Sequence, residues 1–413
     1  MTAPAIDAAR AIADLRQLDR RTGGPGGARR LAWGEEWRQA RELLTELLSE
    51  IGLAPERDPA GNLWARLEGE RSEPALALGS HLDSVPAGGW LDGALGVIAG
   101  VGVLRAWSQS GERPPRDLVL VDWADEEGAR FGHSLLGSSA AAGSLDLDAV
   151  RELRDHDGTP IAEVLAANGV ELKRMPEAAE RRRGIGAYLE LHIEQGPVLE
   201  SESLPIAAVS GCVGIERRRF AFRGQASHAG TTPMDARRDA GLAAAEAALA
   251  VERLAREGGG VGTTGELVLR PGIVTAVAGE AELSVDLRHP DPGELRRIHE
   301  EARGAASAAA GARGCEFDDR PVWRIDPTPF DPALVDTARE ACREVAGSDR
   351  VLTSGALHDA AEMARVLPTA MIFCASARGL SHAPEEDSSE HDLALGIEAL
   401  GLCAARVLEP KGV

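Results

Sequence analysis

Histidine and acidic side chains stand directly after short apolar runs of the sequence. His81 follows ALALGS (75–80), and Glu126 and Glu127 come after DLVLVDWA (117–124). Open α/β sheets bind ligands where their parallel strands end, so side chains in these two places can meet at one edge of a sheet. A histidine in such a place is more often a hydrogen-bonded loop residue, and an acidic pair is more often a solvated turn. Two strands that bring such side chains to the same edge favour a metal site.

A glycine-framed carboxylate, Asp92 in AGGWLDGALGV, stands where an apolar helix is predicted to begin. In isolation it would be interpreted as a helix N-cap. However, His81 and Asp83 lie a short loop upstream, and an acid two residues after a histidine can orient its imidazole. We therefore interpret Asp92 as a candidate ligand and Asp83 as a residue that supports His81.

Two more histidines occupy similar positions. His192 in ELHIEQGP ends a predicted strand, and His382 in GLSHAPEED follows TAMIFCAS (369–376). Nitrogen and carboxylate ligands without thiolate suit Zn²⁺, which we expect first, or Mn²⁺, Co²⁺ or Ni²⁺. A shared carboxylate is the usual way to hold two ions roughly 3.5–4 Å apart. The pattern predicts a site for divalent metal ions, with His81, Asp92, His192, His382 and the Glu126/Glu127 pair as candidate ligands.

A sheet is needed to bring these residues together, and the apolar runs indicate one. The runs at 75–80 and 117–124 flank a predicted buried helix at 92–107, which is the pattern of a parallel sheet covered on both faces. Further strands are predicted at 187–193 and 369–376. We expect an α/β domain with a mixed, largely parallel sheet covered by helices.

The middle of the chain shows a different order of elements, β-α-β-β-α-β, which predicts an α+β open-faced sandwich inserted into the larger domain. We expect the larger domain in two parts, 1–212 and 326–413, and the insertion at 213–325. The predicted strands and helices of the insertion are, in order, 216–224, 235–257, 266–279, 281–289, 294–312 and 315–326.

The composition argues against several classes of protein. The 413 residues include 45 basic and 66 acidic ones, and the net charge of −21 opposes binding to nucleic acid or an anionic membrane. Five cysteines without a CxxC pair favour a reducing compartment. The sequence has neither an apolar signal region nor a run of about 20 apolar residues. We expect a soluble cytoplasmic protein whose ligand is a small molecule.

Eight motifs resemble those of one family over nearly the whole chain. Their order and spacing are similar to the amidase/carbamoylase branch of the dinuclear zinc metallopeptidase clan, which includes N-carbamoyl-L-amino acid hydrolases, β-ureidopropionases and allantoate amidohydrolases. The resemblance implies a hydrolase of linear amides, an inserted lid that also forms a homodimer, and two metal ions. The motifs are GSHLDS, GGWLDGALGV, DEEGARF, LHIEQGP, GQASHAGTTPMDARRDA, DLRH, SGALHDA and SHAPEE.

The resemblance also implies how the metal ligands are shared. His81, Asp92 and His192 would hold one ion, and Asp92 would bridge to a second ion held also by Glu127 and His382. Many peptidase members of the clan carry a carboxylate where this chain has His192, so LHIEQGP favours the amidase branch.

Other positions match residues that act on the substrate. Glu126 matches a general acid/base that would work with a metal-bridging hydroxide and pass a proton to the departing nitrogen. His228 matches a lid histidine that reaches the partner subunit's site and stabilises the carbonyl oxygen. Arg288 matches a clamp for the substrate carboxylate. Gln195 and Gly355 match further substrate contacts.

Three positions depart from the family pattern, and none of them is a metal ligand. Thr275 stands where the family usually has an asparagine that helps to hold the carboxylate, and Leu357 replaces a glycine next to the substrate. Leu91 stands where an aromatic residue usually precedes the bridging aspartate, with Trp90 one residue earlier. Thr275 and Leu357 are therefore expected to alter the substrate pocket.

We expect hydrolysis of an N-carbamoyl-L-amino acid or a similar ureido acid that carries a carboxylate. Allantoate is the next alternative, followed by dipeptides and N-acyl-amino acids. A non-catalytic metal-binding protein on the same fold is an alternative of another class, but such a protein would not need Glu126. The sequence leaves open whether His228 and Arg288 act in their own subunit or in the partner's.

Overall fold

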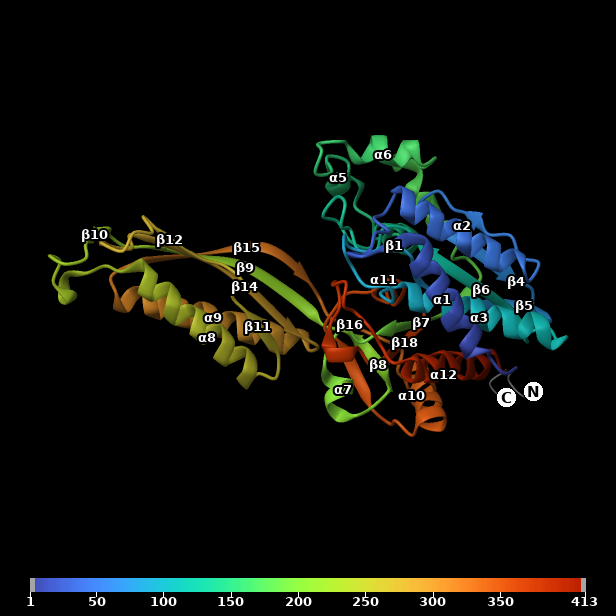
Figure 1. Cartoon of the computed structure of the whole chain (residues 1–413). Coiled ribbons are helices and arrows are strands. Elements are labelled where there is room, and N and C mark those ends of the chain that lie inside the picture. Colours follow the sequence, from blue (N-terminus) through green and yellow to red (C-terminus); the bar gives the residue numbers. More distant parts are fainter. Residues whose placement is uncertain (1–3, 410–413) are drawn as a thin grey trace. The chain divides into compact units, whose positions relative to one another are not determined.

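The computed structural model describes residues 4–409, and these form two compact units (Figure 1). The first unit comprises Met1–Gly211 and Phe330–Val413, and the second unit comprises Cys212–Pro329. Among the helices of the described residues, none is long and apolar enough to cross a membrane.

The first unit contains a mixed sheet whose central strands are parallel, in the order β18-β7-β5-β6. These strands are β5 (Arg71–His81), β6 (Arg116–Trp123), β7 (Ile185–Ile193) and β18 (Thr369–Cys374). In each strand consecutive residues are buried, because both faces of the sheet are covered. The expected mixed, largely parallel sheet is thus confirmed.

Antiparallel strands flank this parallel centre. On one side β8 pairs with β18, and β17 pairs with β8; on the other side β4 pairs with β6 and β3 pairs with β4. The apolar pattern did not predict these strands; β3, β4 and β17 are short, whereas β8 is a buried strand of seven residues that the sequence analysis missed. Their bounds are β3 (Glu56–Arg57), β4 (Leu63–Leu67), β8 (Ile206–Cys212) and β17 (Val351–Ser354).

The parallel strands end at one edge of the sheet. His81, the last residue of β5, is in register with Trp123, the last residue of β6. His192, near the end of β7, is in register with Phe373 on β18. The carboxyl ends of the strands therefore present His81 and His192 at the same edge, where α/β sheets bind ligands.

Helices cover both faces of this sheet. Because successive strand residues point to opposite faces, neighbouring residues of β7 identify the two layers. Leu191 faces Gly396 of α12 (Glu390–Leu408), whereas Glu190 accepts a hydrogen bond from Ala360 of α11 (Asp359–Met363). The α12 layer also contains α1 (Ala8–Thr22), α3 (Ala94–Ser110) and α10 (Pro332–Ala346).

A second apolar cluster of the first unit surrounds the loop after β6. It joins Trp37 of α2 (Glu35–Ser49) to residues of the segment 124–184, which the sequence analysis did not assign. This segment is built of short helices that have too few turns to show a clear periodic pattern. They are α4 (Leu136–Ala142), α5 (Leu147–Val150), α6 (Ile161–Ala167) and the 3₁₀ helix η1 (Leu172–Glu180).

The second unit is an antiparallel sheet with helices on one face, in the strand order β11-β14-β9-β15, with β12 also paired to β14. On β14, alternate residues such as Leu283 and Val285 are buried against the helices, and the residues between them face outward. This is the expected open-faced sandwich. Its elements are β9 (Gly214–Arg223), α8 (Ala240–Glu257), β11 (Val261–Thr263), β12 (Leu267–Arg270), β14 (Glu280–His289), α9 (Pro292–Ala312) and β15 (Glu316–Ile325).

Two predicted elements of this unit differ from the structure. The helix predicted at 235–257 begins only at Ala240, because the Asp239 side chain accepts hydrogen bonds from Gly241 and Leu242 and caps the helix there. The strand predicted at 266–279 is two strands, β12 and β13 (Ala276–Val277), since Pro271 has no N–H for a ladder. β13 pairs with β10 (Ser227–His228).

Candidate metal centre

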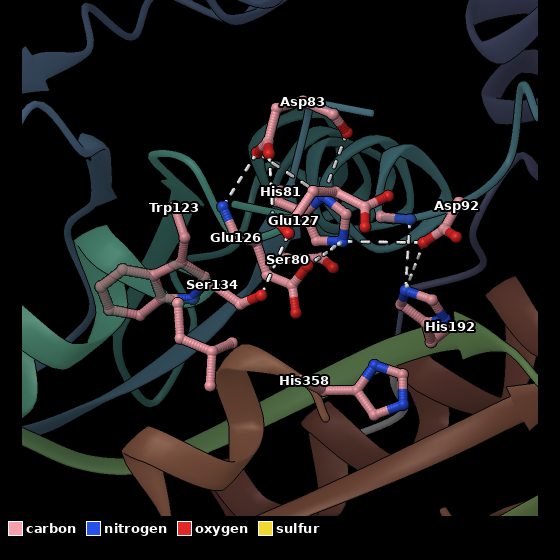
Figure 2. A network of polar contacts seen from close by, with 12 residues as sticks. Ser80, His81, Asp83, Asp92, Trp123, Glu126, Glu127, Ser134, His192 and His358 are labelled. Atoms are coloured by element: carbon pink, nitrogen blue, oxygen red, sulfur yellow. Dashed lines mark hydrogen bonds and ion pairs between the residues drawn. The ribbon is translucent and has the colours of Figure 1, made fainter. Parts of the chain in front are cut away.

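The carboxylate of Asp92 contacts the imidazoles of both His81 and His192 (Figure 2). Its Oδ1 atom is 3.2 Å from Nε2 of His192 and 3.7 Å from Nε2 of His81. Its Oδ2 atom is 3.3 Å from Nε2 of His382, and that nitrogen is 3.4 Å from Oε2 of Glu127. The structure thus forms two possible ligand groups that share Asp92.

The backbone at the start of α3 brings Asp92 to His81. Gly93, which follows Asp92, has φ of +65°, a conformation that favours glycine. A Cβ atom on Gly93 would lie 2.3–2.5 Å from three atoms of the His81 ring. Glycine at this position therefore permits both the turn into the helix and the close packing of the two ligand candidates.

Backbone carbonyl groups fix the tautomers of both buried histidines. Nδ1 of His81 is 3.1 Å from the carbonyl oxygen of Asp83, and Nδ1 of His192 is 2.9 Å from that of Ile193. A carbonyl oxygen only accepts hydrogen bonds, so each Nδ1 carries the proton. In the neutral form of each ring, the Nε2 atom, which faces Asp92, then has the lone pair that a metal ion requires.

The carboxylate of Asp83 has a different set of contacts. It accepts hydrogen bonds from the backbone amides of Glu126 (3.2 Å) and Glu127 (3.1 Å), and lies 3.7 Å from Nδ1 of His81. From the sequence, we expect the Asp83 side chain to orient the imidazole of His81. In the structure the carbonyl group of Asp83 makes the closer contact with the imidazole, and its carboxylate holds the loop that carries the two glutamates.

Glu126 lies beside the cluster without belonging to either ligand group. Its Oε2 atom is 3.5 Å from Nε2 of His81, and its side chain is buried. Burial, together with the charges of Asp359 and Glu127, raises the pKa of Glu126 well above its usual range. Such a carboxyl group can hold a proton at neutral pH, as a general acid/base must.

The histidines differ in charge because Asp92 is close to two of them. Burial lowers the pKa of His81 to about 3, so its imidazole is neutral. Burial also opposes the charge on His192, but the hydrogen bond and charge of Asp92 raise its pKa to about 9. The hydrogen bond to Asp92 likewise raises the pKa of His382 to about 9. Without a metal ion, protons on these two imidazoles compensate Asp92.

The donor set fits a pair of divalent cations. Glu127 is largely buried, and burial with the charge of Asp92 raises its pKa to about 8. Its Oε1 atom is buried and has no hydrogen-bond partner among the described residues, and the same holds for Oε1 of Gln195. Buried carboxylates without sufficient positive charge are costly, and cations held by imidazole and carboxylate would remove that cost.

A third group of possible ligands, Glu190, His192 and His358, is better explained by hydrogen bonding. The carboxylate of Glu190 accepts hydrogen bonds from the Ser80 and Tyr188 hydroxyl groups and from the Ala360 amide. The His358 ring packs edge-on against His192, with the centroids 4.4 Å apart. Its Nε2 atom is 2.8 Å from the Ser354 hydroxyl. Both oxygens of Glu190 and Nε2 of His358 already have partners, so this group is explained without an ion.

The other expected substrate contacts of the first unit lie in two loops. Gln195 has φ of +59° and donates a hydrogen bond from Nε2 to Oδ2 of Asp92 at 2.8 Å. Gly355 is exposed in the segment after β17, and Leu357 is half-buried beside it. His358 follows directly, and its ring packs against the candidate ligand His192.

The remaining expected residues, His228, Thr275 and Arg288, lie in the second unit. Nδ1 of His228 accepts hydrogen bonds from the amides of Gly230 (3.0 Å) and Thr231 (3.2 Å), so its neutral ring carries the proton on Nε2. The exposed Thr275 accepts a hydrogen bond from Ala229 through its carbonyl oxygen.

Arg288 is held on the open face of the second unit's sheet. Its Nε atom donates to Asp286 at 2.8 Å, and Arg217 donates to the same carboxylate at 2.7 Å. Burial would raise the pKa of Asp286, but hydrogen bonds from Arg288 and Arg217 hold it below its usual value. The carboxylate orients both guanidinium groups.

Sequence reasoning missed several residues around the cluster. They are the buried His358 and Glu386, the half-buried Ser381, and the fully buried Arg30, whose Nε atom donates to the carbonyl oxygen of Leu82. Three of them, His358, Ser381 and Glu386, lie in the motifs SGALHDA and SHAPEE. The motifs were therefore recognised, but these three residues were given no role. Arg30, in the sequence GGARRLAW, gave no such signal.

Comparison with known proteins shows what the chain is similar to. Residues 77–406 match the model of the family described as peptidase family M20/M25/M40. The sequence is 38% identical over 377 residues to an N-carbamoyl-L-amino acid amidohydrolase of Geobacillus stearothermophilus, covering 91% of this chain and 92% of that protein. It is 35% identical over 388 residues to a ureidoglycolate hydrolase of Oryza sativa subsp. japonica, covering 92% and 80%.

An allantoate amidohydrolase of Escherichia coli strain K12 is also 35% identical, over 380 residues that cover 91% of this chain and 92% of that protein. Among solved structures, an amidase of the hydantoinase/carbamoylase family from Burkholderia multivorans superposes with a TM-score of 0.90 and 32% identity. That likeness covers 98% of this chain and 99% of the other. The similarity therefore extends over both units.

Proposed function

Because the chain belongs to peptidase family M20/M25/M40, we propose that it hydrolyses an N-carbamoyl-L-amino acid to the amino acid, carbon dioxide and ammonia, with two divalent ions. The chain is a metal-dependent amidohydrolase that acts on C–N bonds, other than peptide bonds, of linear amides. The resemblance to the amidase/carbamoylase branch is confirmed. The observation that carries the mechanism is the position of Glu126, beside the ligand cluster but outside both ligand groups.

The five candidate ligands would hold the two ions as the distances suggest. His81 and His192 would bind one ion, and Glu127 and His382 the other. Asp92 would bind both, since one of its oxygens faces each group. When bound, the ions would supply Lewis acidity, which lowers the pKa of water and polarises a carbonyl group.

Glu126 would move the proton. Its buried carboxyl group has a raised pKa, so it can accept a proton from water and later give that proton to the departing nitrogen. Asp83 holds the amide of Glu126 and thereby fixes the base relative to His81. A merely metal-binding protein would have no use for this arrangement.

His228 and Arg288 would act on the substrate itself. The Nε2–H group of His228 is a hydrogen-bond donor suited to a carbonyl oxygen that becomes negative during the reaction. Arg288 would bind the substrate carboxylate through its planar guanidinium. A clamp of this kind favours an amino-acid-like ureido substrate over a neutral amide.

The substrate is tested by a panel. Metal-reconstituted protein is assayed for ammonia release from N-carbamoyl-L-amino acids, β-ureidopropionate, allantoate and ureidoglycolate. N-acyl-amino acids and dipeptides, which release no ammonia, are assayed in parallel for the release of a free amino acid. We expect the highest kcat/KM with an N-carbamoyl-L-amino acid. If only allantoate or only ureidoglycolate is hydrolysed, that compound replaces the N-carbamoyl-L-amino acid as the proposed substrate. Hydrolysis of dipeptides alone would refute the amidase assignment.

We also propose that the second unit forms a homodimer. On the β11/β12 edge of its sheet, Val261, Leu267 and Leu269 are exposed, and Leu242 and Leu249 are exposed on the neighbouring helix α8. An edge strand with exposed apolar side chains can pair with a second copy and continue the sheet.

Light scattering coupled to size exclusion tests the dimer. The double variant Leu242→Glu/Leu249→Glu is expected to elute as a monomer. Val322→Glu, a matched change of an exposed apolar residue on the opposite edge strand β15, is expected to stay dimeric. A monomeric wild-type chain, or a dimer that only Val322→Glu disrupts, would refute this interface.

A further inference from the structure

Glu386 carries a buried carboxylate in the loop that also contains His382. Its Oε1 atom accepts hydrogen bonds from the backbone amides of Leu91 (3.1 Å) and Asp92 (3.0 Å). Its Oε2 atom lies 2.8 Å from the hydroxyl group of Ser381. One side chain therefore joins the loop that carries Asp92 to the loop that carries His382.

Ser381 extends this connection to the side chain of Asp92. Its hydroxyl oxygen is 3.0 Å from Oδ2 of Asp92 as well as 2.8 Å from Glu386. The single hydroxyl hydrogen can be donated to only one carboxylate at a time. When the hydroxyl is donated to Glu386, the amides of Leu91 and Asp92 still join Oε1 of Glu386, so the two loops remain linked.

Packing leaves room for Glu386 because residue 89 is glycine. A Cβ atom on Gly89 would lie 2.0 Å from the carboxyl carbon and from Oε1 of Glu386. A side chain at position 89 would therefore push the carboxylate away from the two amides. Gly89 and Glu386 form one arrangement, although neither is a ligand candidate.

A second contact joins the same two loops. The Asp387 carboxylate accepts a hydrogen bond from Nε1 of Trp90 at 3.2 Å, and the Arg16 guanidinium lies 3.7 Å from the centroid of the Trp90 ring. The sequence departs from the family pattern at this point, with the aromatic residue at 90 instead of 91. Trp90 anchors the loop through its contacts with Asp387 and Arg16.

The backbone of His382 needs such support. Its φ of +55° lies in the left-handed region, which non-glycine residues adopt only where the surrounding structure enforces it. Half of the His382 side chain is exposed, so packing around the ring does not supply the constraint. The contacts of Ser381 and Glu386 do.

We propose that Glu386 is a positioning residue, which fixes the backbone of Asp92 and the loop of His382 at the spacing that the second metal ion requires. The inference rests on the proposed function, since it assumes that these residues bind two ions. Residues that orient metal ligands typically change metal affinity or activity by roughly 10–100-fold when they are mutated. The ion held by Glu127 and His382 should be weakened, whereas the ion held by His81 and His192 should be retained.

Binding of Zn²⁺ and Co²⁺ to the metal-free full-length protein tests the proposal, by titration calorimetry and by the visible absorption of bound Co²⁺. Glu386→Ala is expected to raise the dissociation constant of the second ion by roughly 10–100-fold. It should also lower kcat with little change in KM. Glu386→Gln keeps an oxygen for the two amides and an NH₂ group that can donate to Ser381, so most of the affinity should return.

Two further variants keep the test decisive if Glu386→Ala does not fold. Ser381→Ala removes one hydroxyl group, and Gly89→Ala displaces the carboxylate without changing it; both should weaken the second ion. Glu385→Gln changes the exposed neighbouring glutamate, and Gly26→Ala adds a methyl group where nothing lies within 4 Å. Both controls should bind two ions as the wild type does.

The outcomes separate this inference from the proposed function. If the wild type binds two ions and the folded variants bind both equally well, Glu386 has no positioning role and the proposed function stands. If the wild type itself binds fewer than two ions, the proposed function is overturned, and the inference with it. Weakening of the first ion instead of the second would also overturn the inference.

Discussion

Oδ2 of Asp92 lies 3.3 Å from Nε2 of His382, although the two residues come from opposite ends of the sequence. The other oxygen of the same carboxylate faces His192, so a single side chain connects the two ligand groups. The consequences of losing Asp92 and of losing His382 should therefore differ.

We predict that His382→Ala retains one metal ion per chain and that Asp92→Ala retains none. The reason is that His382 belongs to one ligand group, whereas Asp92 belongs to both. Metal content after dialysis, measured by mass spectrometry, checks the prediction. The control is His156→Ala, which changes an exposed histidine of the first unit and should keep two ions. Equal metal content in the two test variants would contradict a shared carboxylate.

The adjacent residues Glu126 and Glu127 should respond differently to the same substitution. Glu126→Gln should keep two ions and lower kcat by about 10²–10⁴-fold, the usual contribution of a general acid/base. Glu127→Gln should lose an ion, because Oε2 of Glu127 faces His382. Metal analysis and steady-state kinetics on the pair distinguish these effects. Unchanged turnover in Glu126→Gln would remove this residue from the mechanism.

Metal affinity should rise with pH. In the metal-free protein, the charge and hydrogen bonds of Asp92 raise the pKa of His382 and, against the effect of burial, of His192 to about 9, so both imidazoles are protonated at neutral pH. An ion binds only the neutral imidazole, and each proton that it displaces changes the apparent affinity by about tenfold per pH unit. The affinity should increase up to about pH 9.

Calorimetry in two buffers of different ionisation enthalpy counts the protons released at neutral pH. His81 should contribute none, since burial lowers its pKa to about 3 and it is already neutral. An affinity that does not change between about pH 6 and pH 9 would contradict this protonation state. The measurement needs no turnover, so it is independent of the substrate.

Much of the candidate site could be predicted because its candidate ligands follow strands. His81 and His192 stand at the ends of apolar runs, and parallel strands that end at one edge bring such residues together. Asp92 could be predicted because it stands where an apolar helix begins. The prediction succeeds because both faces of the sheet are covered. This burial makes the strands apolar, and the apolar runs in turn reveal where the strands end.

Residues that act through backbone contacts could not be predicted. Glu386 stands in the acidic sequence PEED, which is typical of a solvated turn, yet its partners are two amides near the other end of the chain. Arg30 is likewise fully buried, although arginine is almost never fully buried unless it is paired. A hydrogen bond to a distant amide leaves no periodic signal, because any residue supplies the N–H group.

A mixing experiment decides which subunit supplies His228. The resemblance implies that it reaches the partner subunit's site, so Glu126→Gln and His228→Ala chains, each inactive alone, should regain activity when mixed dimers form. One site of such a dimer would combine an intact Glu126 with an intact His228. Activity should return only under conditions that exchange subunits, which size exclusion of tagged chains can verify. No recovery in verified mixed dimers would mean that His228 acts in its own subunit.

Arg288 should matter only for substrates that carry a carboxylate. Arg288→Ala should raise KM for an N-carbamoyl-L-amino acid, because the bidentate partner of the carboxylate is lost. Arg288→Lys should restore little, since an ammonium group lacks the planar fork that Asp286 orients in Arg288. The comparison substrate is the same ureido compound without the carboxylate. The wild type and Arg288→Ala should hydrolyse it with similar kcat/KM. A variant that loses activity equally toward both compounds would show that Arg288 supports the fold of the second unit and not the recognition of the substrate.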